Sequence, residues 1–125
     1  MIQNPENIER LMMLLMTLRR HGITDTKLLS AVESVPPEIL SGVEEDEILE
    51  HLKVLQSLDV SDRHMVLEVG TGAGLRTVLL SKLARRVYTV ELDRARHDQV
   101  QEMFSDLGYD NISALQGNGC QGWPQ

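Results

Sequence analysis

The stretch Glu68-Val69-Gly70-Thr71-Gly72-Ala73-Gly74 decides how this sequence folds. It overlaps the end of an apolar run of strand length, residues 65–69, and precedes residues 75–84, whose apolar side chains recur at helical spacing. Glycines at alternate positions allow a tight turn and a close approach of backbone to a ligand. The next helix offers unpaired N–H groups and the positive end of its dipole. The stretch therefore predicts a strand, a ligand-binding loop and a helix.

The residues downstream continue this alternation of strands and helices. We expect a second strand at 87–91, a helix at 94–107 that ends before Gly108, and a weaker third strand at 112–116. Strands that alternate with helices form parallel sheets with right-handed crossovers. The sequence thus predicts an α/β fold, a partial doubly wound (Rossmann-like) sheet whose two crossover helices lie on one face.

The residues upstream are predicted to be helical. Apolar spacing indicates helices at 8–20, 25–34 and 44–57, with a connector at 36–43 and a capping box made by Ser41 and Glu44. Four carboxylates at 44–47 complement the dipole of the third helix. We expect a helical segment at 1–60 and a cofactor-binding β-α-β-α-β half at 61–125, together forming one compact domain.

Composition excludes several classes of function. The chain has 125 residues and a formal net charge of −7, which disfavours binding to nucleic acid or to an anionic membrane. We expect no spanning segment, because the longest apolar run is far shorter than a bilayer requires, and no signal peptide. The single cysteine, Cys120, fits a reducing cytosol and a cytoplasmic location. The four histidines lack the spacing of metal ligands, so no metal site is expected.

The ligand is suggested by residues on either side of the glycine loop. Glu91 ends the second predicted strand 21 residues after Gly70, a position from which a carboxylate reaches a ribose. The glycines follow G-x-G-x-G rather than the G-x-G-x-x-G of dinucleotide sites, and Glu68 precedes them. This combination favours S-adenosylmethionine. An NAD-binding module and a plain strand–helix turn are the weaker alternatives.

The chain resembles the protein-L-isoaspartate O-methyltransferase family in motifs spread over much of its length. VLEVGTGAG at 66–74 looks like the family's first cofactor motif, and VYTVE at 87–91 looks like its ribose strand. Further similarities lie at 18–25, 35–36, 107–112, 117–119 and 122–124. The resemblance implies a methyltransferase fold. It also implies a function, the transfer of a methyl group from S-adenosylmethionine to L-isoaspartyl residues in damaged proteins.

The resemblance also implies roles for individual residues. The three loop glycines would bring backbone to the methionine part of the cofactor, and Glu68 would support the loop. Glu91 would hold the ribose, Leu92 would pack beside the adenine, and Asn118, where the family usually has Asp, would lie near the adenine amino group. The predicted cofactor-binding residues are Glu68, Gly70, Thr71, Gly72, Gly74, Glu91, Leu92 and Asn118.

Two differences from the family pattern lead to an alternative prediction of function. Between Pro36 and the third helix, the family has a Gly-, Thr-, Ser-, Gln- and Pro-rich segment that forms much of the substrate site and carries a hydroxyl linked to methyl transfer. That segment is missing here, and Ser41 is not taken as a substitute, so no catalytic residue is assigned. The family also continues through further strands, which makes this a truncated member. The alternative is a catalytically inactive relative that binds cofactor or self-associates.

The missing strands have a consequence for partners. In the doubly wound order, a fourth strand pairs with the first, so residues 65–69 would here form an apolar sheet edge. Such an edge invites pairing with another chain. We therefore expect a homo-oligomer formed through strand 65–69, beside isoaspartyl proteins or peptides as substrates.

Overall fold

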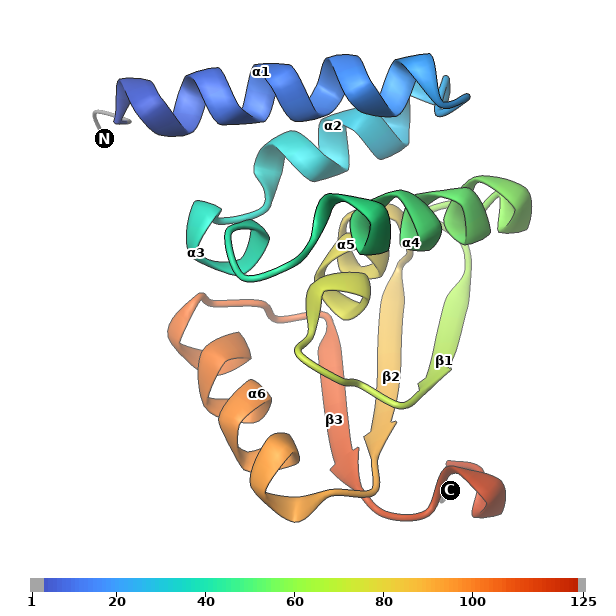
Figure 1. Ribbon diagram of the computed structural model, residues 1–125. Coiled ribbons are helices and arrows are strands. Elements are labelled where there is room, and N and C mark those ends of the chain that lie inside the picture. Colours follow the sequence, from blue (N-terminus) through green and yellow to red (C-terminus); the bar gives the residue numbers. More distant parts are fainter. Residues whose placement is uncertain (1–3, 124–125) are drawn as a thin grey trace. The chain divides into compact units, whose positions relative to one another are not determined.

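The computed structural model describes residues 4–123, which divide into two compact units between Asp59 and Val60. The first unit contains helices only, and the second contains a sheet with two crossover helices (Figure 1). Among the described residues, no helix is both long and apolar enough to cross a membrane.

The first unit is built from α1 (Pro5–Arg20), α2 (Thr26–Ser34), α3 (Pro37–Leu40) and α4 (Glu45–Leu58). The three longer helices confirm the predicted ones, although α1 begins earlier, because Asn4 caps it and Pro5 fills its first turn. Asp25 caps α2 by accepting from the Lys27 N–H, at 2.9 Å. The side chain of Gln56 on α4 bonds backbone in the turn before α2, through the N–H groups of Thr24 and Asp25 and the carbonyl of Gly22.

The connector between α2 and α4 differs from its prediction. Residues 37–40 form the short helix α3, which starts at a proline, a residue suited to the first turn. The capping box predicted for Ser41 and Glu44 is wrong. The Ser41 hydroxyl donates to the carbonyl of Glu38 instead, at 3.3 Å, and Glu44 caps α4 without a side-chain bond. Three carboxylates in the first turn of α4 supply the favourable charge there.

The second unit contains β1 (Met65–Val69), α5 (Leu75–Leu83), β2 (Arg86–Glu91), α6 (Arg94–Asp106), β3 (Ile112–Gln116) and the single turn η1 (Gly119–Gln121). The strands are parallel in the order β1-β2-β3, and Glu68 on β1 is paired with Thr89 on β2. This arrangement confirms the predicted α/β class and the partial doubly wound sheet. Both outer strands have their predicted bounds.

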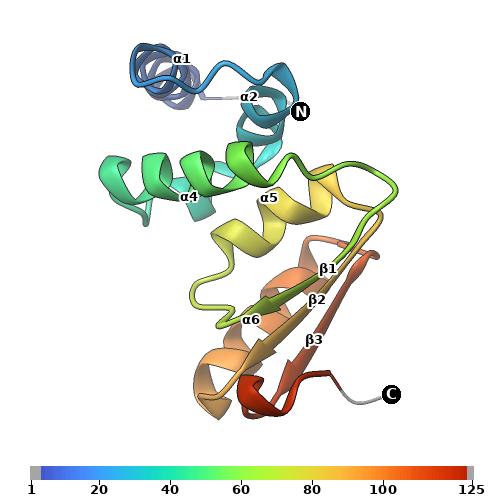
Figure 2. The same cartoon turned by 90° about the vertical axis from the view of Figure 1, so that its right-hand side faces the viewer.

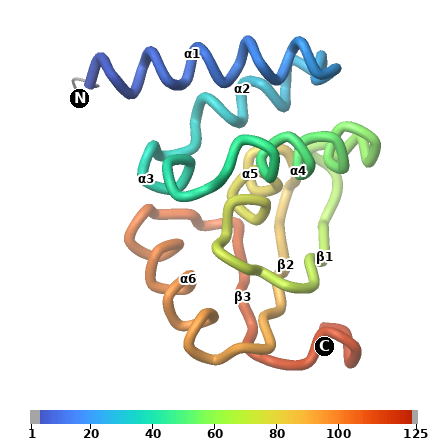
Figure 3. The backbone as a smooth tube through the Cα atoms, in the orientation of Figure 1, coloured from blue at the N-terminus to red at the C-terminus, as the bar shows by residue number. Residues whose placement is uncertain are grey.

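The two faces of the sheet are covered differently. Helices α5 and α6 lie on the same face, as predicted (Figure 2). The chain after β3 turns back through η1, and the backbone tube shows this return beside the sheet (Figure 3). The Trp123 ring meets Tyr88 of β2 edge-on, with 4.9 Å between ring centroids. Gly119 lies so close to Val69 of β1 that a β-carbon there would clash with it.

Candidate cofactor-binding site

The glycine loop joins β1 to α5 in a conformation that only glycine adopts easily. Gly70, Gly72 and Gly74 have φ angles of 88°, 58° and 96°, the left-handed region in which other L-residues are strained. The Gly70 N–H donates to the carbonyl of Val90 at 2.8 Å, so the loop leaves the sheet directly from the ladder. Gly74 is the N-cap of α5. The loop therefore ends where the first N–H groups of a helix are free.

The three glycines differ in the space around them. A β-carbon placed on Gly70 or Gly72 would meet no atom within 4 Å, so the backbone there is open to a ligand. A β-carbon on Gly74 would lie 2.9 Å from the Met103 methyl and 3.2 Å from the Phe104 ring, both on α6. The first two glycines thus leave room, and the third allows α6 to pack closely.

Glu91, the last residue of β2, holds the loop through its carboxylate. Its Oε1 accepts from the Gly72 N–H and its Oε2 from the Asp93 N–H, each at 3.0 Å. The Asp93 bond lowers the pKa of Glu91 below its ordinary value; burial opposes this, and the Gly72 bond adds to it. Glu91 is therefore ionised at neutral pH. Each carboxylate oxygen can accept a second hydrogen bond, so the group can still receive a ligand hydroxyl.

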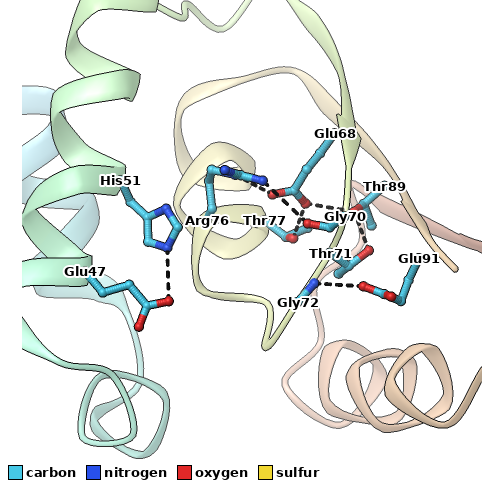
Figure 4. A network of polar contacts seen from close by, with 10 residues as sticks. All are labelled: Glu47, His51, Glu68, Gly70, Thr71, Gly72, Arg76, Thr77, Thr89 and Glu91. Carbon is cyan, nitrogen blue, oxygen red and sulfur yellow. Dashed lines mark hydrogen bonds and ion pairs between the residues drawn. The ribbon is translucent and has the colours of Figure 1, made fainter. Parts of the chain in front are cut away.

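Glu68 anchors the loop from the opposite side, within a network of five side chains (Figure 4). Its carboxylate is 5% exposed, forms an ion pair with Arg76 at 2.8 Å, and accepts from the hydroxyls of Thr77 and Thr89. The Thr89 hydroxyl donates its single hydrogen to Glu68. The Oγ1 atoms of Thr71 and Thr89 lie 2.6 Å apart, so Thr71 is the donor in the hydrogen bond between them. The network connects β1, β2, the loop and the first turn of α5.

The two remaining predicted residues lie at the same edge of the sheet, since the carboxyl ends of parallel strands meet there. Leu92 follows β2 and is 69% exposed, which leaves an apolar side chain uncovered beside Glu91. Asn118 follows β3, and its Oδ1 accepts from the Cys120 N–H at 2.9 Å, which caps η1. The structure therefore brings all eight predicted residues to one end of the sheet, with the Glu68 and Thr71 side chains turned inward.

Comparison with known proteins shows to which family the chain belongs. The family model described as protein-L-isoaspartate(D-aspartate) O-methyltransferase matches residues 9–125. The chain belongs to this family. A protein-L-isoaspartate O-methyltransferase of Rhodospirillum centenum is 38% identical over 90% of the chain and 59% of its own length. One of Paracoccus denitrificans is 35% identical over the whole chain and 66% of its own length.

A solved structure supports the fold of the family member. A protein-L-isoaspartate O-methyltransferase superposes with a TM-score of 0.77 at 18% identity, covering 91% of this chain and 44% of its own. The chain thus spans about 60% of the length of the curated relatives it matches. The alignment with the Paracoccus relative runs over 143 positions although the chain has 125 residues, so it contains gaps opposite residues of the relative.

Sequence reasoning about this family member missed Arg76, Thr77 and Thr89. Arg76 and Thr77 occupy the first turn of α5, and Thr89 is the register partner of Glu68. A polar residue inside the otherwise apolar run 87–90 was the available signal, because a buried hydroxyl requires a partner. Its partner could be named only after the register of β1 and β2 was known.

Other polar or hollow features belong to the helical unit. Within the helical unit, a cavity of about 440 Å³ is bounded by α1, the end of α2, α3 and the start of α4. Its lining combines apolar side chains with the charged residues Arg10, Glu33, Glu44 and Glu45. His51 lies 3.8 Å from Glu47, one helical turn away on exposed α4, which is a surface contact (Figure 4). No cluster suited to a metal ion occurs among residues 4–123.

Proposed function

We propose that the glycine loop and the ends of β2 and β3 bind S-adenosylmethionine. The open backbone at Gly70 and Gly72 would approach the methionine part of the cofactor. Gly74 would allow the start of α5 to pack closely against α6. Glu91 would accept from the ribose hydroxyls, Leu92 would lie beside the adenine, and Asn118 near its amino group. Glu68 and Thr71 would act from inside, by holding the loop. The uncovered loop backbone beside an ionised Glu91 is the observation that carries this proposal.

We further propose that the function is methyl transfer to L-isoaspartyl residues of damaged proteins. Membership of the family supports this activity. A carboxylate oxygen of the isoaspartyl side chain would form a bond to the methyl carbon while the carbon–sulfur bond breaks, giving a methyl ester and S-adenosylhomocysteine. Positioning the two reactants in line supplies much of the acceleration in such a displacement. The residues that would position the acceptor are not assigned.

The cofactor part of the proposal is tested by changing Glu91 to alanine. S-adenosylhomocysteine should bind more weakly by about 1–3 kcal/mol, the value of a hydrogen bond to a charged group. Isothermal titration calorimetry measures this difference directly. Asp98→Ala is the control, because Asp98 is an exposed carboxylate on α6. Equal affinities for the unmodified chain and the Glu91 variant would exclude Glu91 as the ribose ligand.

The activity is tested with a peptide that contains one isoaspartyl residue, compared with the same peptide containing aspartate. Radiolabelled methyl groups from S-adenosylmethionine should enter only the isoaspartyl peptide, as base-labile esters. A chain that binds S-adenosylhomocysteine but methylates neither peptide would instead establish the inactive relative as its function. The binding and activity assays thus separate the cofactor proposal from the substrate proposal.

A further inference from the structure

Arg76, in the first turn of α5, extends its guanidinium back toward the end of β1 (Figure 4). Its Nε donates to the Glu68 carboxylate at 2.8 Å, and its Nη2 lies 3.5 Å from the carbonyl oxygen of Gly70. Glu68 is buried and also accepts from the hydroxyls of Thr77 and Thr89, which fixes the position of its carboxylate. The guanidinium is therefore held beside the first glycine of the loop.

The Arg76 guanidinium still has hydrogen-bonding capacity for a ligand. Glu68 and Gly70 take two of its five N–H groups, and the other three have no partner among residues 4–123. The Arg76 side chain is one-third exposed, so a ligand can reach these groups. A guanidinium is planar and can receive a carboxylate through two parallel hydrogen bonds. Arg76 is thus a cation that one carboxylate orients and that can bind a second.

Arg76 and Glu91 lie on opposite sides of the glycine loop (Figure 4). Glu91 accepts from the Gly72 N–H, whereas Arg76 contacts the carbonyl of Gly70 at the start of the loop. The loop thus has a hydrogen-bond acceptor on one side and a cation on the other. S-adenosylmethionine has the matching groups, because its ribose hydroxyls and its methionine carboxylate lie on opposite sides of the sulfur.

The start of α5 adds backbone donors near this guanidinium. Gly74, the N-cap, supplies no side-chain bond, and the N–H groups of Leu75 and Arg76 have no acceptor within the described part of the chain. Free N–H groups and the positive end of a helix dipole favour an anion. The helix start and the guanidinium therefore favour the same kind of ligand group, a carboxylate.

We propose that Arg76 binds the α-carboxylate of the methionine part of S-adenosylmethionine. The guanidinium donates two hydrogen bonds to the carboxylate oxygens, and Glu68 positions the guanidinium at the loop. This inference rests on the proposed cofactor function, to which it adds the residue that recognises the amino-acid end of the cofactor. Arg76 thereby favours S-adenosylmethionine over nucleosides that have the same ribose but no carboxylate.

Isothermal titration calorimetry with two ligands tests this role. The first ligand is S-adenosylhomocysteine, and the second is its decarboxylated analogue, in which hydrogen replaces the carboxylate. The unmodified chain should bind S-adenosylhomocysteine more tightly than the analogue, by on the order of tenfold to a hundredfold. Arg76→Gln keeps an amide that can donate to Glu68, and it should lower this ratio of affinities by on the order of tenfold.

Two further variants separate recognition of the carboxylate from other effects. Arg85→Gln is the matched control, because it removes the same charge from an exposed arginine that precedes β2, at the other end of that strand from Glu91. It should leave the ratio unchanged. Arg76→Lys should give an intermediate ratio, since lysine keeps the charge but not the planar fork. A merely structural role for Arg76 would weaken the binding of both ligands equally.

The outcomes distinguish this inference from the cofactor proposal. An unchanged ratio in Arg76→Gln overturns the role of Arg76, and so does an equal change of the ratio in Arg85→Gln. In both cases the unmodified chain still binds S-adenosylhomocysteine, so the proposed cofactor function stands. If the unmodified chain binds neither ligand, the cofactor function fails, and the role of Arg76 fails with it.

Discussion

Changing Gly74 to alanine should lower the free energy of unfolding by about 2–5 kcal/mol, through two separate costs. An alanine at a φ of 96° adopts a left-handed backbone, which costs about 1–2 kcal/mol. Its β-carbon would also press on Met103 and Phe104, and overpacking of this kind costs about 1–3 kcal/mol. Urea denaturation followed by far-ultraviolet circular dichroism measures the sum.

Gly70→Ala separates these two costs. Its φ of 88° imposes the same backbone strain, but the added methyl group meets no atom within 4 Å. Gly70→Ala should therefore destabilise the chain by the backbone cost alone, about 1–2 kcal/mol. Equal losses for the two variants would show that α6 moves aside freely, and that Gly74 is not needed for close packing.

Glu68→Ala should cost about 2–4 kcal/mol of unfolding free energy, because it removes an acceptor on which three side chains converge. The hydroxyls of Thr77 and Thr89 would lose a buried partner, and the Arg76 guanidinium would lose its ion pair. Arg76 is one-third exposed and can turn to water, which limits the loss. Denaturant unfolding of the two chains measures the difference.

Glu47→Ala is the control for this loss, since Glu47 is also a carboxylate in contact with a single basic side chain. Its partner, His51, lies 3.8 Å away, and the Glu47 side chain is 58% exposed. Surface pairs of this kind contribute about 0–1 kcal/mol. If Glu47→Ala and Glu68→Ala had the same effect, the buried network would contribute no more than a surface contact.

Much of the fold could be predicted, because local sequence signals mark its boundaries. β1 ends where the glycines begin, α6 ends before Gly108, and α2 begins after Asp25, which caps it. The start of α1 at the Asn4 cap was missed, because the apolar spacing begins only at Ile8. Strand and helix periods then follow from the apolar spacing. The connector at 36–43 was missed as a helix because α3 has only four residues, too few to show a period.

The buried contacts of Glu68 could not be predicted from the sequence, for a different reason. Glu91 is recognisable by its spacing from the glycines, which is a property of one chain segment. The bonds of Glu68 to Thr77 and Thr89 depend on the register between β1 and β2 and on the start of α5. Likewise, the use of the Asn118 oxygen to cap η1 depends on how the chain turns after β3. Sequence spacing carries no record of such contacts.

The edge-on packing of Trp123 against Tyr88 makes the sheet unit optically distinct. The chain has one tryptophan, two tyrosines and one phenylalanine, and all four lie beyond Asp59. Intrinsic fluorescence and the near-ultraviolet dichroic signal therefore originate wholly in the second unit, with the indole reporting contact with β2. The helical unit is silent at these wavelengths. A melt recorded through the indole follows the second unit, whereas a far-ultraviolet melt follows the helices of both units. A difference between the two melts would therefore report separate unfolding of the helical unit without any introduced label.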